Sequence, residues 1–216
     1  MYNTRPGLLI GFHGCDKSRQ QDLLINSVSM PISEKPYDWL GHGMYFWENN
    51  ADRALEWAKA KESAKKIEEA AVIGAVIDLG HCCDFLDSSF TKMLTAYHNL
   101  MKIELEKVGK SILENEDLKS DRHHDKLLRY LDCATLEFMH EQIRTQYKKD
   151  MAAKNHSSLK IFDSVRGAFL EGGAAYIGSG FCAKSHIQIC IRNSNCIKGY
   201  FLKRDELDFI LQESTR

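Results

Sequence analysis

Residues 39–58 read WLGHGMYFWENNADRALEWA, with three Trp, one Tyr, one Phe and two Gly in twenty positions. The apolar run MYFW, between the glycines and the polar ENN, predicts a strand. Asn49 or Asn50 is then the expected N-cap of a helix over residues 51–66. The aromatic side chains could serve only to pack this strand and helix. Alternatively, they could form a pocket wall that stacks on a flat ligand, with the glycines allowing a close backbone approach.

Strands and a helix are expected on either side of this segment. GLLIGFHG (residues 7–14) predicts a buried strand that ends in a glycine turn, and DKSRQQDLLINSV (16–28) has helical spacing of its apolar residues. AAVIGAVIDL (70–79) predicts a strongly apolar strand, and SLKIFDS (158–164) another. Strands are therefore expected both in the first third of the sequence and in its last third.

The last third of the chain combines a glycine-rich loop with two further strands. VRGAFLEGGAAYIGSGFCAKS (residues 165–185) contains five glycines and is expected to be a loop. HIQICIR (186–192) and CIKGYFL (196–202) are expected to form an antiparallel pair joined by the turn NSN.

Between about residues 84 and 155 the apolar residues recur at helical intervals. This pattern predicts at least two amphipathic helices, joined by the polar stretch ENEDLKSDRHHD (residues 114–125). We therefore expect an α+β protein: one domain over residues 1–216, with a β-rich core that a helical insertion divides.

Length and composition are those of an ordinary globular domain. The chain has 216 residues, of which 44% are apolar and 27% charged. A net charge of −1 gives no overall attraction to nucleic acid or anionic membrane. No apolar run is long enough for a membrane span or a secretory leader, so we expect a cytoplasmic protein with no membrane partner. Seven irregularly spaced Cys and no C-x-x-C motif favour reduced thiols over disulfides.

Several other chemistries lack their sequence patterns. The clusters HCCD (residues 81–84) and RHHD (122–125) do not have the ligand spacing of a zinc site, so no metal is expected. Cys15 lies two residues after His13, but no third residue that would orient a Cys–His pair is evident. Neither the P-loop nor the G-x-G-x-x-G spacing occurs, which excludes these two nucleotide-binding motifs.

Three separate blocks nevertheless resemble a known enzyme superfamily when they are taken in order. They are GFHG (residues 11–14), LGHGMYF with the helix ADRALEW (40–57), and SHIQICIRN (185–193). They resemble the His-Tyr-Glu class of ADP-ribosyltransferases, that of diphtheria toxin and the poly(ADP-ribose) polymerases. That class has a His-Gly at the end of its first strand, a G-x-G-[ILM]-Y-F strand and a late strand with a Glu. The resemblance implies a split β-sheet core of the ADP-ribosyltransferase type with flanking helices.

The resemblance implies a role for five residues around NAD. Gly14 is expected to hold the nicotinamide carboxamide through its backbone, and His13 to bind a ribose hydroxyl of the adenosine half. Tyr45 would stack on the nicotinamide ring, Trp57 would be the second stacking aromatic, and Gly43 would let the backbone turn beside the pocket. Each also has a structural alternative, because a strand-end histidine or an aromatic next to a helix often serves packing alone.

The third block departs from the class pattern. Gln188 stands where the resemblance places the glutamate, and an amide can donate a hydrogen bond but supplies no charge. Glu171, in the loop before that strand, is the candidate for the missing carboxylate, although a loop acid is commonly just solvated. Arg166 is the candidate contact for an NAD phosphate or for the target.

These expectations define a function and its alternatives. The chain is expected to be an NAD-dependent ADP-ribosyltransferase (a glycosyltransferase of EC 2.4.2 type) that releases nicotinamide and modifies a protein or a nucleic acid, RNA or DNA. The resemblance extends to toxin and antiviral phage-defence effectors, which implies a toxin–antitoxin pairing with an antitoxin or inhibitor protein. An NAD glycohydrolase and a non-catalytic NAD- or ADP-ribose-binding module remain alternatives. The basic residues of the C-terminal region could line a nucleic-acid groove or form a solvated edge: Arg192, Lys198, Lys203 and Arg204.

Overall fold

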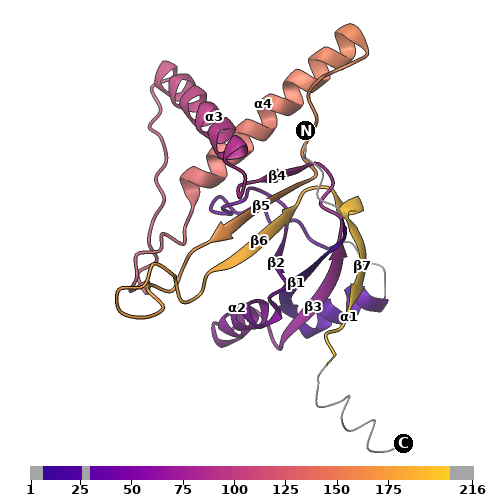
Figure 1. Cartoon of the computed structure of the whole chain (residues 1–216), viewed down its shortest axis with the longest axis vertical. Coiled ribbons are helices and arrows are strands. Elements are labelled where there is room, and N and C mark those ends of the chain that lie inside the picture. The colour runs from indigo at the N-terminus through magenta and orange to yellow at the C-terminus, as the bar shows by residue number, and fades with distance from the viewer. Residues whose placement is uncertain (1–6, 26–29, 205–216) are drawn as a thin grey trace, which may run out of the picture. The chain divides into compact units, whose positions relative to one another are not determined.

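The computed structural model describes residues 7–25 and 30–204 (Figure 1). These residues divide into two compact units. The first unit holds residues 30–45 and 79–196 together with Gly7, and the second holds residues 8–25, 46–78 and 197–204. Both units contain strands and helices, so the protein is α+β, as the sequence predicts.

The second unit is built around β1 (Leu9–Asp16), which pairs antiparallel with both β2 (Met44–Glu48) and β3 (Ala70–Ile77). Strand β3 also pairs antiparallel with β7 (Ile197–Phe201), so the order in this unit is β2-β1-β3-β7. Only the last three residues of β2 belong to this unit. The apolar pattern of residues 7–14 and 70–79 therefore identified two real neighbours in the sheet. The glycine turn expected at Gly14 is wrong, because β1 continues to Asp16 and remains paired with β3.

Helices α1 (Lys17–Ile25) and α2 (Ala51–Ser63) complete the second unit. Asn50 is the N-cap of α2, since its side-chain oxygen accepts a hydrogen bond from the backbone N–H of Arg53 at 3.0 Å. A side chain at position 14 would collide with the backbone carbonyl of Ala54, so Gly14 is what lets α2 lie close to β1.

The first unit contains β4 (Cys82–Asp84), β5 (Ser164–Phe169) and β6 (His186–Ile191), in that order. Strand β5 is parallel to β4 and antiparallel to β6. The helices expected between residues 84 and 155 are α3 (Ser88–Lys107) and α4 (Tyr130–Lys154), which pack against each other. A buried cluster joins α4 to one face of the strands through Leu40, Cys83, Leu136, Met139, Ile143, Phe162, Val165 and Cys190.

Strand β5 starts later than predicted. The prediction placed a strand over residues 158–164 and a loop from residue 165, whereas the strand is Ser164–Phe169. Gly167 misled the prediction, because a glycine inside a strand resembles a loop signal. A Cβ at Gly167 would lie 2.8 Å from Cη2 of Trp39, so the glycine makes room for the indole ring.

The expected antiparallel pairing of residues 186–192 with 196–202 is wrong. Strand β6 pairs with β5, and β7 pairs with β3. The linking residues Ser194–Cys196 form a short 3-10 helix instead of a hairpin turn. Asn193 accounts for this turn, because its backbone oxygen accepts from Cys196 N–H at 2.9 Å and its side-chain oxygen from Asn195 N–H at 3.1 Å.

Candidate functional site

The predicted site residues fall in both units. Gly43, Tyr45, Arg166, Glu171 and Gln188 belong to the first unit. The remaining three belong to the second unit: His13, Gly14 and Trp57.

In the second unit, the first and second sequence blocks are in contact. The imidazole of His13 lies 6.2 Å from the ring of Trp57 and 5.9 Å from that of Phe46, measured between centroids. Lys61 places its ammonium group 3.6 Å from the Trp57 ring centroid, a cation–π contact. His13 is thus set among aromatic rings supplied by the second block.

In the first unit, the second and third blocks are in contact. A Cβ at Gly43 would lie 2.5 Å from the Cys190 sulfur and 2.6 Å from the backbone oxygen of Ile191, so only glycine lets this turn approach β6 so closely. Gly43 was predicted to lie beside a pocket for NAD. What the structure places next to it is the C-terminal half of β6.

Tyr45 stabilises the turn that precedes it through hydrogen bonds of its hydroxyl. Its ring packs against the buried cluster under α4, and burial raises the pKa of the hydroxyl well above its usual value. The hydroxyl donates to the backbone oxygen of Gly41 at 2.8 Å and accepts from the backbone N–H of Leu40 at 3.0 Å. Stacking of Tyr45 on nicotinamide stays a prediction, beside this structural role.

Gln188 has a fixed orientation. Its side-chain oxygen accepts a hydrogen bond from the indole N–H of Trp39 at 2.6 Å. An indole N–H can only donate, so the amide oxygen must face Trp39 and the amide –NH₂ is left to donate elsewhere. Trp39 therefore determines how Gln188 presents its polar atoms.

An aromatic and polar surface surrounds Gln188. On β5 and β6, Gly167 lies opposite Gln188 and Phe169 opposite His186, so all four residues share one face of the strands. The Trp39 ring covers this face, with its centroid 5.0 Å from that of Phe169. We call this surface, formed by Trp39, Phe169, Glu171, His186 and Gln188, the Gln188 face.

Glu171 joins this surface through His186. One oxygen of its carboxylate lies 3.7 Å from Nδ1 of His186, and the two side chains are 12% and 1% exposed. The same nitrogen lies 2.7 Å from the backbone oxygen of Lys184. Because both of these neighbours are acceptors, Nδ1 carries the proton. His186 and Gln188 are two residues apart on one strand, so Glu171 contacts the side chain next to Gln188.

Arg166 lies on the opposite face of β5, because its neighbour Gly167 is the residue that shares a face with Gln188. Its guanidinium is 3.2 and 3.3 Å from the two carboxylate oxygens of Asp84, and both side chains are almost fully buried. Breaking a buried pair of this kind costs about 3–5 kcal/mol. The expected contact of Arg166 with an NAD phosphate stays a prediction, because forming it would require breaking this ion pair.

The sequence did not indicate the pairing of Glu137 with Arg192. Arg192 contacts both carboxylate oxygens of Glu137, at 2.5 and 3.0 Å, and donates to the backbone oxygen of His42 at 2.9 Å. Burial by itself would raise the pKa of Glu137. The hydrogen bonds and charge of Arg192, with the N–H of His42, outweigh burial and lower that pKa. This pair joins α4, the end of β6 and the turn before Tyr45.

Three members of the expected basic cluster have acidic partners. Arg192 pairs with Glu137, as above; within the second unit, Lys198 lies 3.9 Å from Asp78 and Lys203 lies 3.4 Å from Asp52. These ion pairs reduce the positive charge available to a polyanion. Whether these residues line a nucleic-acid groove stays a prediction.

The residues that the structure describes contain no assembled site for a metal ion or for a reactive cysteine. No three His, Cys, Asp or Glu side chains there are grouped so as to hold a metal ion. All seven cysteines are free thiols. Burial raises the pKa of the Cys15 thiol to about 11, with a smaller contribution from Asp16, so this thiol is protonated at neutral pH.

Comparison with known proteins finds no match for this chain. No protein-family model, no curated protein and no solved structure matches the chain. The resemblance to ADP-ribosyltransferases thus rests on the three sequence blocks. Within residues 7–25 and 30–204, no helix combines the length and the apolar character needed to cross a membrane.

Proposed function

We propose that the protein is an NAD-dependent ADP-ribosyltransferase, which transfers ADP-ribose from NAD to a macromolecular acceptor and releases nicotinamide. One observation carries the proposal: the second sequence block contacts the first block in one unit and the third block in the other. Trp57 lies against His13, and Gly43 lies against β6 next to the Gln188 face. Segments far apart in the sequence are thus neighbours in the pairs that the resemblance requires.

The chemistry needs groups that stabilise positive charge on a ribose. Cleavage of the bond between nicotinamide and ribose passes through an oxocarbenium-like transition state, which bound aromatic rings orient and a nearby carboxylate stabilises. Gln188, with its oxygen held by Trp39, offers its –NH₂ to a ribose hydroxyl. It supplies no negative charge, so the charge must come from another residue.

Glu171 supplies that charge in this proposal. Its carboxylate is mostly shielded from solvent and contacts His186, which adjoins Gln188 on the same face. A carboxylate in a partly desolvated position acts on a developing cation more strongly than one in bulk water. In this proposal Gln188 therefore provides a hydrogen bond and Glu171 provides the negative charge.

The test measures nicotinamide release and label transfer together. The protein is incubated with NAD labelled on its adenine, first alone and then with cell protein or RNA. Glu171→Gln is expected to lower the rate of nicotinamide release at least tenfold, with little change in KM, because it removes charge stabilisation needed only in the transition state. The matched control Glu104→Gln, at an exposed position on α3, should leave the rate unchanged.

The outcomes separate the alternatives. Label in protein or RNA supports transfer. Nicotinamide release without labelled macromolecule makes the protein an NAD glycohydrolase, and NAD binding without release makes it a non-catalytic module. Absence of NAD binding by the intact protein refutes the proposal altogether.

A further inference from the structure

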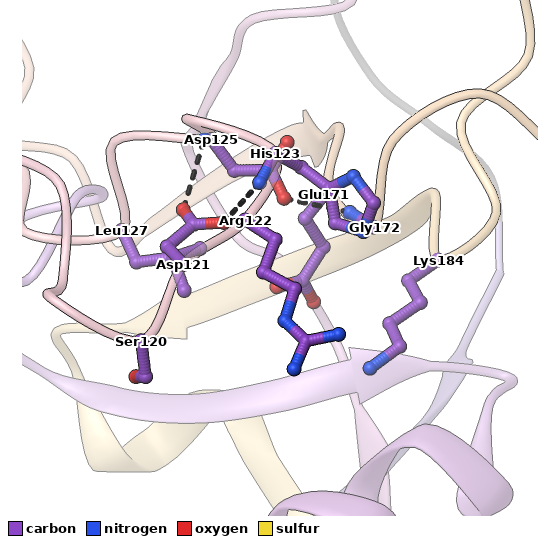
Figure 2. Close-up of a pocket in the computed structure, with 9 residues that line it drawn as sticks. All are labelled: Ser120, Asp121, Arg122, His123, Asp125, Leu127, Glu171, Gly172 and Lys184. Atoms are coloured by element: carbon purple, nitrogen blue, oxygen red, sulfur yellow. Dashed lines mark hydrogen bonds between the residues drawn. The ribbon is translucent and has the colours of Figure 1, made fainter.

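A pocket of about 240 Å³ lies in the first unit, between the turn that precedes α4 and the loop that joins β5 to β6 (Figure 2). Its lining comes from two distant segments of the chain: Ser120, Asp121, Arg122, His123, Asp125 and Leu127 from one, and Glu171, Gly172 and Lys184 from the other. The backbone N–H of Gly172 donates to the Asp125 carboxylate at 2.7 Å, which ties the two segments together. The pocket is therefore defined by contacts between the segments that form it.

The carboxylates of this pocket already have hydrogen-bond or charge partners. Asp121 accepts hydrogen bonds from the backbone N–H groups of His123 and Asp125, both at 2.9 Å. Asp125 accepts from Gly172, and Glu171 lies beside His186. The backbone donors compensate Asp121 and Asp125 within the protein, so these two acids do not need the cations of the pocket.

Two cations of the pocket are left for a ligand. The side chains of Arg122 and Lys184 are exposed, and within the described part of the chain neither forms an ion pair. Figure 2 shows the guanidinium of Arg122 and the ammonium of Lys184 extending to the same side, away from the carboxylates of Asp121 and Asp125; the carboxylate of Glu171 extends to this side as well. A planar guanidinium and a flexible ammonium that converge in this way are well suited to a phosphate group.

The adjoining loop presents aromatic and apolar side chains to solvent. Tyr176, Ile177 and Phe181 are 66%, 104% and 74% exposed. The loop nevertheless has a defined shape: Ala175 N–H donates to the oxygen of Phe181 at 2.8 Å, and Ala183 N–H to that of Gly173 at 2.9 Å. These bonds shape the loop that carries the two exposed aromatic rings, and the base of this loop forms one wall of the pocket.

The sequence of the loop side of the pocket favours an anionic partner. Within the first unit there is no Asp or Glu from residue 172 to residue 196, although the whole chain carries a net charge of −1. Exposed aromatic rings on the loop that also carries Lys184 match single-stranded nucleic acid, in which every base offers a face for stacking and every nucleotide a phosphate. A lipid surface would require a larger cluster of cations, and a protein partner would leave the pairing of Arg122 with Lys184 on one side of the pocket unexplained.

We propose that this surface binds single-stranded nucleic acid, with a phosphate at Arg122 and Lys184 and bases stacked on Tyr176 and Phe181. The binding does not depend on NAD. If the proposed function holds, this strand is the macromolecular acceptor, because Glu171 lines the pocket and also contacts His186 of the Gln188 face.

Binding is measured by fluorescence anisotropy, with the full chain, no NAD, and labelled single-stranded RNA and DNA of about 12 nucleotides, within the usual site size. Arg122→Gln and Lys184→Gln should each weaken binding and reduce the slope of log K against log salt by about 0.7, as expected for one lost phosphate contact. Tyr176→Ala and Phe181→Ala should each weaken binding about fivefold to a hundredfold, as loss of one stacked base does.

Matched controls lie on α3, away from the pocket lining. Lys102→Gln removes an exposed cation that pairs with Glu106, and Ile103→Ala removes an exposed apolar side chain. Both should leave binding unchanged. All these positions are exposed, so circular dichroism should show each variant folded as the parent protein is.

Four outcomes would overturn the proposal: no salt-dependent binding, binding unchanged in all four surface variants, tighter binding of duplex than of single strands, or binding of anionic vesicles or proteins in place of oligonucleotides. Failure of the proposed function shows separately. Oligonucleotide binding without nicotinamide release refutes the enzyme and leaves this surface standing, whereas release with label found only in protein refutes the bound strand as the acceptor.

Discussion

His140 provides a test of how burial within the first unit controls stability. The side chain is 4% exposed on α4, and its ring meets that of Phe162 edge-on at 5.9 Å. Within the described residues, its Nε2 has no hydrogen-bond partner. Burial, helped by the charge of Arg192, lowers the pKa of His140 to about 3. The folded protein therefore holds this imidazole neutral at pH values where the unfolded chain protonates it.

The sign and size of the effect follow from linkage. An unfolded-state pKa of about 6.5 means that the unfolded state binds more protons than the folded state between pH 6.5 and the folded value. The contribution of His140 to stability is thus complete above about pH 6.5 and is lost as the pH falls toward about 3. At pH 5 the loss amounts to about 2 kcal/mol, since the unfolded-state pKa lies about 1.5 units above that pH and each unit is worth about 1.4 kcal/mol.

The perturbation is His140→Phe, which keeps an aromatic ring against Phe162 and removes the titrating group. Urea unfolding at pH 8 and pH 5 gives the change in unfolding free energy for each protein. The variant should lose about 2 kcal/mol less than the parent over this range, because changes at other titrating groups cancel in the comparison. His156→Phe, at an exposed position, should retain the parent's pH dependence.

Parallel pH profiles for the parent and His140→Phe would refute this reasoning. They would mean that His140 is not buried in its neutral form, or that the unfolded state shifts its pKa equally. A variant that is less stable at pH 8 but has a flatter profile would still support the linkage, because the argument concerns the slope and not the absolute stability.

Three further predictions concern packing and thiols. Tyr45→Phe should lower the urea-unfolding free energy by about 1–3 kcal/mol, because two backbone groups lose their partner; an unchanged midpoint would contradict the hydroxyl contacts. Gly167→Ala should cost about 1–3 kcal/mol by the same assay, since the added methyl meets an indole ring, while Gly180→Ala, in open space, should be neutral or slightly stabilising; equal effects would count against the close contact. A thiol reagent should modify Cys82 and Cys182 in the native protein and all seven thiols only after unfolding; rapid native reaction of all seven would disprove their burial.

Local signals made the helices predictable. Asn50 followed by an alanine-rich amphipathic run predicts a helix with Asn50 as its N-cap. The apolar spacing after residue 84 predicts α3 and α4. These patterns are contained within each segment, so no knowledge of distant contacts was needed. The same is true of β1 and β3, each of which contains a short apolar run.

Long-range contacts account for what the sequence did not reveal. Gly167 looks like a loop residue until Trp39 is seen against it, and the hydrogen bond of Trp39 with Gln188 joins residues 149 positions apart. Strand pairing is similarly non-local, which is why β6 and β7 were expected to form a hairpin. The carboxylate of Glu137 gave no sequence signal, because its meaning depends on Arg192.

The placement of the three tryptophans makes each unit optically distinct. Trp39 belongs to the first unit, where its indole N–H is bonded to Gln188. Trp47 and Trp57 lie in the second unit, with ring centroids 5.6 Å apart. Replacing the second pair by Phe would leave a single emitter whose wavelength and quenching report on the surroundings of Gln188. Replacing Trp39 would leave the signal of the second unit, so ligand binding and unfolding could be followed in each unit without an added dye.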